Sequence, residues 1–166
     1  MSDLDPFSAN DQTLARVVQG DLLQMALAGA FDVIVHGCNC QCQMGKGIAL
    51  SIKRKFPEAF EADCATSKGD PDKLGTISVA KIVRASASFQ IVNGYTQLHW
   101  RGAGLKADYV AIAGVMREVK LRFSGKRIGY PKIGAGLAGG DWNRISSIIA
   151  SELAGEHHTY VEFVDQ

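Results

Sequence analysis

The chain carries a loop with four glycines in seven residues, at positions 134–140, between a short apolar segment and the start of a helix. The apolar segment ends at Tyr130 and is typical of a buried strand, and Asp141 opens the helix. Glycine has no Cβ, so the backbone can adopt positive φ and bring its N–H groups close to a ligand. Successive N–H groups that lead into a helix N-terminus form a cradle for an anion. The loop therefore predicts a phosphate-binding site.

Another glycine loop, Met44-Gly45-Lys46-Gly47-Ile48, lies earlier in the chain and is built in the same way. By chain order we call residues 44–48 the first glycine loop and residues 134–140 the second. Two such loops indicate a ligand with two phosphates, or with a phosphate and a sugar. The G-x-G-x-x-G match at residues 134–139 adds little, because the dinucleotide fingerprint belongs in a first βα turn, with an acidic residue about 20 residues later. The alternative is that both loops are glycine-rich turns without a ligand.

Length and composition predict one globular domain over residues 1–166, with a polar N-terminal extension at about residues 1–12. Hydrophobic residues make up 46% of the chain and charged residues 21%, which argues against disorder. The net charge of +1 indicates no broad basic surface, so nucleic acid is not an expected partner.

No segment approaches the ~18 apolar residues of a membrane span. The N-terminus is polar and does not resemble a signal peptide. We therefore expect a cytoplasmic protein with no membrane partner, and a monomer.

Four cysteines raise the question of a metal site. Cys38, Cys40 and Cys42 alternate along the chain, whereas Cys64 stands apart. Alternation in an extended segment sends the side chains to one face. Zinc sites use C-x₂₋₄-C pairs, which this pattern does not provide. We interpret the cysteines as reduced thiols that line or back a pocket, and we expect no bound metal.

Strand patterns and helix patterns alternate along the chain. Ile48, Ile52 and Phe56, for example, lie on one face of a predicted helix. Strands are predicted at 15–21 (with its turn), 31–36, 76–83, 89–92, 127–130 and 159–164, and helices at 22–28, 47–56, 57–67, 107–123 and 141–153. This alternation predicts an α/β protein, a three-layer α/β/α sandwich with a mixed, mostly parallel central sheet.

In such sheets ligands bind outside the carboxyl ends of the strands. Both glycine loops follow predicted strands, as do Asp21, His36–Asn39 and Asn93–Gln97. We therefore expect these segments to converge on one crevice.

Together these motifs resemble the macrodomain family of ADP-ribose-binding modules, over about residues 15–164. Gly20-Asp21-Leu22 is similar to the family's G-D-[IL] turn, and Val35-His36-Gly37-Cys38-Asn39 stands where many members have V-N-A-A-N. Met44–Ala49 resembles the M-G-x-G-I-A loop of one branch, and Pro131–Leu137 with Asp141-Trp142 resembles its second phosphate loop. That branch contains ADP-ribose-1″-phosphate phosphatases and hydrolases that remove ADP-ribose from acidic side chains or DNA bases.

The resemblance implies a role for each matching residue. Asp21 would accept a hydrogen bond from the adenine amino group, a role compatible with capping its helix. Asn39 would hold the distal ribose, and the second glycine-rich segment would wrap the diphosphate with its N–H groups. The ligand-binding residues implied in this way are Asp21, Leu22, Asn39, Gly45, Lys46, Gly47, Ile48, Asn93, Tyr95, Thr96, Gly134, Ala135, Gly136, Leu137 and Ala138.

The chain departs from the family pattern at three positions. His36 replaces the first asparagine of V-N-A-A-N. By this resemblance, Gln97 occupies the position at which the members that act on DNA bases have a lysine. A glutamine side chain cannot supply an amine nucleophile or a base. Ala138 stands where the glutamyl hydrolases have an aspartate. Neither the lysine-based nor that aspartate-based chemistry carries over.

The remaining catalytic candidates are Asp141, His36 and Asn39. Asp141 or His36 would orient or deprotonate a water that attacks a 1″-phosphate or a C1″ linkage. The structural alternatives are a helix N-cap for Asp141 and a hydrogen-bonded core histidine for His36. His99 is a further candidate.

The function expected from these residues is binding of ADP-ribose and hydrolysis of a derivative, with ADP-ribose 1″-phosphate as the first choice and no cofactor. One alternative is a non-catalytic ADP-ribose reader. Another is a hydrolase that removes ADP-ribose from modified protein or nucleic acid. A domain that binds another nucleotide, or none, is the alternative outside this group.

Overall fold

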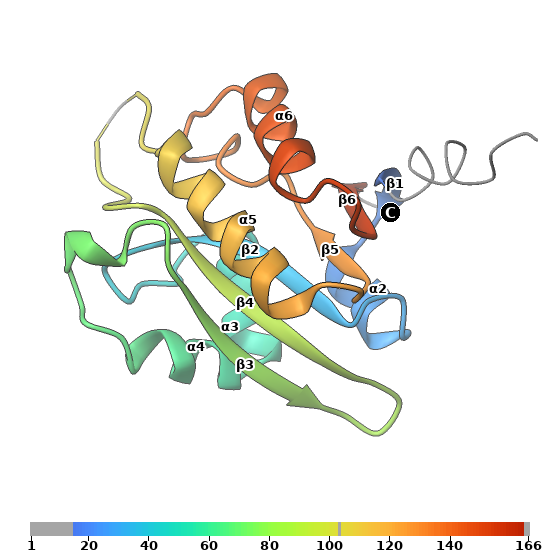
Figure 1. Cartoon of the computed structure of the whole chain (residues 1–166). Helices are drawn as coiled ribbons and strands as arrows, with labels where there is room; N and C mark the ends of the chain where they lie inside the picture. The colour runs from blue at the N-terminus through green and yellow to red at the C-terminus, as the bar shows by residue number, and fades with distance from the viewer. Residues whose placement is uncertain (1–14, 103, 165–166) are drawn as a thin grey trace, which may run out of the picture.

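A six-stranded sheet forms the middle layer of the protein (Figure 1). The computed structural model describes residues 15–102 and 104–164, so the N-terminal extension expected at residues 1–12 lies outside the described residues. The strands are β1 (Ala15–Gly20), β2 (Val33–Asn39), β3 (Ile77–Val83), β4 (Ser88–Gln97), β5 (Ile128–Tyr130) and β6 (His158–Phe163).

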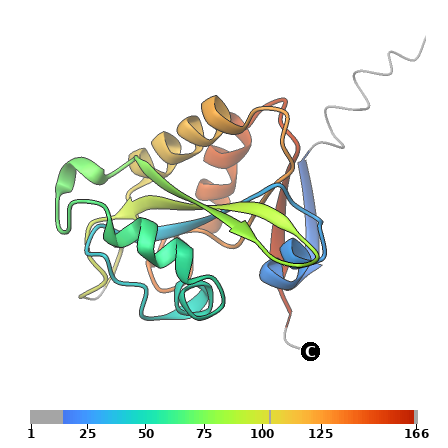
Figure 2. The same ribbon diagram turned by 90° about the horizontal axis from the view of Figure 1, so that it is seen from below.

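Helices cover both faces of this sheet. The helices are α2 (Leu22–Leu27), α3 (Gly47–Lys55), α4 (Pro57–Cys64), the 3₁₀ turn η1 (Pro71–Lys73), α5 (Tyr109–Phe123) and α6 (Trp142–Glu152). Figure 2 shows α5 and α6 on one side of the sheet and α3 and α4 on the other. The predicted three-layer α/β/α sandwich is confirmed. Among these helices, none combines the length and the apolar character that a bilayer crossing requires.

The strand order β1-β6-β5-β2-β4-β3 brings the candidate segments together. Every neighbouring pair is parallel except β3 with β4, which is antiparallel. The carboxyl ends of the five parallel strands therefore meet at one edge of the sheet, as the sequence predicts. We call this edge, with the loops that leave it, the ligand edge.

Each face of the sheet has its own apolar core. Val33 and Val35 of β2 point toward α5 and α6, whereas Ile34 points toward α2, α3 and α4. This alternation explains the continuous apolar run of β2, because a strand covered on both faces has no polar side to present.

The end of the strand predicted at 89–92, before Asn93–Gly94, is wrong, because β4 continues to Gln97. Asn93, Gly94 and Tyr95 pair with β2 on one side, and Gly94 pairs with Ile77 of β3 on the other. A Cβ on Gly94 would lie 2.5 Å from Val115 Cγ1 in α5. Glycine is present here because a helix packs closely on the strand, not because the chain turns.

Candidate ligand-binding site

The second glycine loop lies between β5 and α6 and presents free backbone donors. The Gly140 N–H donates to the Gly134 carbonyl at 2.7 Å, and the Gly139 N–H donates to the Gly136 carbonyl at 3.1 Å. These bonds curl the loop so that, within the described residues, the N–H groups of Gly136, Leu137 and Ala138 have no protein acceptor. Three successive free donors form an anion cradle.

This loop is fastened to the segment that follows β4. The Ala138 carbonyl accepts hydrogen bonds from the N–H groups of Lys106 and Ala107, at 2.8 and 3.2 Å. Gly139 has φ of 75°, and a Cβ there would lie 2.9 Å from the Gly104 carbonyl oxygen. The cradle therefore depends on glycine at this position.

The first glycine loop leads into the open N-terminus of α3. Lys46 is the N-cap residue, but its side chain makes no capping hydrogen bond. By contrast, α2, α5 and α6 are each capped by the side chain of an aspartate, namely Asp21, Asp108 and Asp141. The first N–H groups of α3 therefore remain available at the ligand edge, where the helix dipole adds positive potential.

Asn39 ends β2 and organises the loop that follows. Its Nδ2 donates to the Gln43 carbonyl at 3.0 Å, and its Oδ1 accepts from the Gln41 N–H at 2.9 Å. Gln41 Nε2 in turn donates to the Leu98 carbonyl at 2.9 Å, which joins the loop to the end of β4. The predicted ribose-binding residue is therefore fixed at the junction of two ligand-edge loops.

Asp21 lies at the ligand edge after β1. Its Oδ1 accepts from the N–H groups of Leu23 and Gln24, at 3.0 and 3.2 Å, so it caps α2. The neighbouring Leu22 is 3% exposed and its side chain packs in the core. Leu22 can therefore offer only its backbone to a ligand.

Asp141 follows the second glycine loop with an exposed carboxylate. Its Oδ1 accepts from the Asn143 N–H at 3.0 Å, and its own N–H donates to the Tyr109 hydroxyl at 3.1 Å. Asp141 therefore caps α6, and its carboxylate still lies at the surface beside the cradle.

His36 lies in the core. It is 1% exposed, and its Nε2 lies 2.7 Å from Asn93 Oδ1. Burial lowers the pKa of His36 to about 4, although the hydrogen bond that His36 donates to Asn93 opposes this shift. The core-histidine alternative therefore describes His36 better than the water-activating role.

Asn93, Tyr95 and Thr96 are likewise buried, at 0%, 0% and 1% exposure. Asn93 Nδ2 donates to Ser78 Oγ at 3.1 Å, and the Tyr95 hydroxyl pairs with Ser78 Oγ at 2.8 Å. Because they lie inside a central strand, the side chains of Asn93 and Tyr95 stabilise the core and do not flank the ligand edge.

Asp63 and Lys73, two residues that the sequence motifs do not point to, complete this buried network. Tyr95 donates its O–H to Asp63 Oδ1 at 2.8 Å, and burial raises the pKa of the Asp63 carboxyl. Asp63 is 0% exposed and Lys73 is 7% exposed. One signal was available for Asp63, because it lies one helical turn after the buried Ala59 on the apolar face of α4.

The four cysteines are free thiols, of which Cys38 and Cys40 are buried. Cys38 and Cys40 pack around Tyr95 beneath the ligand edge. Within residues 15–102 and 104–164, no three His, Cys, Asp or Glu side chains gather in a way that could hold a metal ion.

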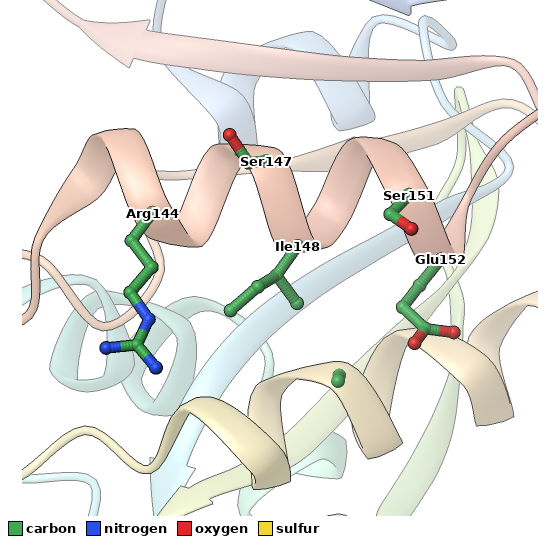
Figure 3. Close-up of a pocket in the computed structure, with 6 residues that line it drawn as sticks. Arg144, Ser147, Ile148, Ser151 and Glu152 are labelled. Atoms are coloured by element: carbon green, nitrogen blue, oxygen red, sulfur yellow. The ribbon is translucent and has the colours of Figure 1, made fainter.

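An open depression between α5 and α6 is separate from the ligand edge. In Figure 3, Arg144, Ile148 and Glu152 point from α6 toward α5. Glu152 accepts from Arg117 at 2.8 Å, and the Arg144 guanidinium lies 4.0 Å from the centroid of the Tyr109 ring. None of the predicted ligand-binding residues lines this depression.

The fold and the two cradles agree with the comparison to protein families. The model of the Macro domain family matches residues 35–149, and the chain belongs to this family. A 17.5 kDa protein of Enterobacteria phage T4, itself uncharacterised, is 33% identical over 141 residues, which cover 82% of this chain and 88% of the phage protein.

Two further relatives have names that state an activity. A DNA ADP-ribosyl glycohydrolase of Mycobacterium tuberculosis is 30% identical over 136 residues, which cover 80% of this chain but only 36% of that protein. An ADP-ribose 1″-phosphate phosphatase of Debaryomyces hansenii is 38% identical over 66 residues, which cover 37% of each chain. This chain thus matches only part of the length of either enzyme.

Solved structures support the fold. The macrodomain of Mycobacterium tuberculosis DarG superposes with a TM-score of 0.70 at 23% identity, over 92% of this chain and 98% of that one. DarTG of Thermosipho africanus, solved in complex with ADP-ribose, has a TM-score of 0.68 at 16% identity, over 90% of this chain and 42% of that one.

Proposed function

We propose that this macrodomain binds ADP-ribose at the ligand edge and hydrolyses an ADP-ribose derivative. The observation that carries the proposal is the pair of backbone cradles, one at the uncapped N-terminus of α3 and one at Gly136–Ala138. Hydrogen bonds from N–H groups to charged oxygens contribute about 1.5–3 kcal/mol each, so two cradles suit a diphosphate.

The groups around the cradles supply the remaining contacts of the proposed complex. The carboxylate of Asp21 would accept from the adenine amino group, and the amide of Asn39 would hold the distal ribose. Gly45, Lys46, Gly47 and Ile48 would line one side of that ribose and its phosphate, and the segment from Gly134 to Ala138 would wrap the diphosphate.

We propose ADP-ribose 1″-phosphate as the substrate, in line with the name of the Debaryomyces relative. Water would attack the phosphorus, the bond from phosphorus to the 1″ oxygen would break, and that oxygen would take up a proton. Asp141 is the carboxylate beside the cradle that could orient the water, with Asn39 holding the ribose. The free N–H donors would stabilise the charge that develops on the phosphate.

A second candidate reaction is release of ADP-ribose from DNA. It is favoured by the name of the mycobacterial relative, which matches 80% of this chain. The segment after β4 also presents Trp100, 36% exposed and stacked on His99 with ring centroids 4.2 Å apart. A base could stack on such a surface. Gln97 in place of the lysine that the resemblance implies for this chemistry weighs against it.

Calorimetric titration with ADP-ribose, with AMP as the control ligand, tests the binding step first. Phosphate release from ADP-ribose 1″-phosphate and ADP-ribose release from a modified oligonucleotide then separate the two reactions. Binding with neither activity would identify a reader of ADP-ribose. Absence of binding would remove the proposal as a whole.

A further inference from the structure

A buried lysine holds its amine against a cysteine in the loop between β2 and α3. Lys73 Nζ lies 3.2 Å from the Cys40 carbonyl oxygen and 3.7 Å from Cys42 Sγ. The same ammonium lies 4.5 Å from the centroid of the Tyr95 ring. Lys73 is only 7% exposed, so these contacts restrict its amine to the neighbourhood of the sulfur.

Cys42 is placed for reaction with a small oxidant. It is partly exposed, unlike the fully buried Cys40. Its backbone has φ of 54°, in the left-handed region that residues other than glycine seldom adopt. Its Sγ lies 3.3 Å from the Asp63 carbonyl oxygen and 3.6 Å from Thr66 Oγ1, neither of which is a good nucleophile toward oxidised sulfur. The amine of Lys73 is the group in contact with Sγ that can attack it.

We propose that Cys42 and Lys73 form a reversible oxidative cross-link between Sγ and Nζ. Hydrogen peroxide first oxidises the Cys42 thiol: an S–O bond forms, the O–O bond breaks, water leaves, and the product is a sulfenic acid. The Lys73 ammonium loses a proton to water, and the resulting amine attacks Sγ: an S–N bond forms, the S–O bond breaks, and the departing hydroxide leaves as water with a second proton from nitrogen. Two equivalents of an external thiol reverse the reaction, restoring the thiol and the amine and forming the disulfide of the reductant.

The cross-link would act on the ligand edge. Cys42 lies between Gln41 and Gln43, whose backbone N–H and carbonyl groups hold the amide of Asn39. An S–N bond is much shorter than the 3.7 Å contact, so the two side chains must approach each other, and any movement of Cys42 is passed to its neighbours in the chain. Displacement of Asn39 would weaken ADP-ribose binding. This consequence, unlike the cross-link itself, rests on the proposed function.

The cross-link is tested by mass spectrometry on the whole chain treated with hydrogen peroxide. The expected product is lighter by two hydrogen atoms and returns to the starting mass with dithiothreitol. After trypsin, the peptide spanning residues 17–46 is joined to the peptide spanning residues 69–81, because cleavage after Lys73 is blocked. Cys64→Ser, which removes the exposed thiol, should leave this product unchanged.

Cys42→Ser should abolish the cross-linked peptide pair, and so should Lys73→Arg, which keeps the positive charge. If Lys73→Arg does not fold, Cys42→Ser and the peptide map of the unaltered chain decide the question. Normal cleavage after Lys73 in oxidised protein would overturn the proposal, and so would a disulfide that accounts for the mass change.

Titration with ADP-ribose before and after oxidation tests the consequence for binding. The affinity should fall by about tenfold or more on oxidation, as expected for a displaced positioning loop, and recover with reductant. Cys42→Ser should bind as the reduced chain does and should not respond to peroxide. A cross-link found by mass without any ADP-ribose binding would contradict the proposed function but not the cross-link.

Discussion

Nε2 of His36 lies 2.7 Å from Oδ1 of Asn93, and this contact begins a chain of hydrogen bonds through the core. A carbonyl oxygen can only accept, so the histidine donates and its Nε2 carries the proton. Asn93 donates to Ser78, and Ser78 and the Tyr95 hydroxyl lead to Asp63. These hydrogen bonds link β2, β4, β3 and α4 beneath the ligand edge, so they stabilise the part of the core that supports the ligand-edge loops.

This contact predicts a loss of stability at mildly acidic pH. The pKa of His36 is about 4 in the folded protein and 6.5 for an exposed histidine, so between these pH values only the unfolded chain binds the extra proton. The stabilisation is therefore complete above pH 6.5 and is lost as the pH falls toward 4, by roughly 3 kcal/mol for this group. The free energy of unfolding, measured by urea titration at several pH values, should show this fall.

His36→Asn supplies the matched control, because an amide can still donate to Asn93 but does not titrate. The variant should lose the part of the pH dependence that His36 contributes, whereas the contribution of His158, whose pKa is also lowered by burial, should remain. An unchanged pH profile in His36→Asn would show that the histidine is not buried in its neutral form.

Two substitutions at Asp21 separate helix capping from ligand binding. Asp21→Ala removes the acceptor for Leu23 and Gln24 and should cost about 1 kcal/mol of stability. Asp21→Ser keeps a capping oxygen but has no carboxylate. Both variants should lose ADP-ribose affinity, while only the alanine variant should unfold at a lower urea concentration. Full affinity in Asp21→Ser would mean that the carboxylate makes no adenine contact.

Glycine at position 136 should be needed for ADP-ribose binding but not for folding. A Cβ there would meet no atom within 4 Å, and its φ is not in the left-handed region. Gly136→Ala should therefore change the stability by no more than about 0.5 kcal/mol. The added methyl group would stand beside the free N–H donors, so the affinity for ADP-ribose should fall in calorimetry.

Gly140→Ala is the contrasting variant in the same loop. Its Cβ would lie 2.5 Å from the Gly134 carbonyl oxygen, so the backbone must shift, at a cost of roughly 1–3 kcal/mol. Equal effects of Gly136→Ala and Gly140→Ala on stability would contradict the distinction between a ligand-facing and a packing glycine.

The architecture could be predicted from the sequence because apolar periodicity reports which faces are covered. The continuous apolar run of β2 and the spaced apolar residues of α3 both follow from burial that the structure confirms. The two glycine loops were placed correctly for the same reason, since a strand pattern precedes each loop and a helix pattern follows it.

Local turn chemistry was misleading where packing between distant segments decides the conformation. Asn93-Gly94 is typical of a hairpin turn. The dipeptide lies instead in a central strand, because β2 and β3 pair with it and Val115 needs the space beside Gly94. His36 is a second example. Its polar side chain at a strand end indicates a catalytic site, but the sequence does not show that Asn93 on β4 is its buried hydrogen-bond partner.

Trp100 offers a way to separate the two candidate reactions. It is 36% exposed, stacked on His99, with the Arg101 guanidinium 5.3 Å from its ring centroid. Trp100→Ala removes a surface on which a nucleic-acid base could stack, a contact that contributes about 1–3 kcal/mol per base. If an oligonucleotide is the substrate, KM for ADP-ribose release should rise by about tenfold or more.

Turnover of ADP-ribose 1″-phosphate, which has no base beyond its own adenine, should stay the same in this variant and serves as the internal control. Parallel losses with both substrates would mean that Trp100 maintains the loop after β4 and contacts no nucleic acid.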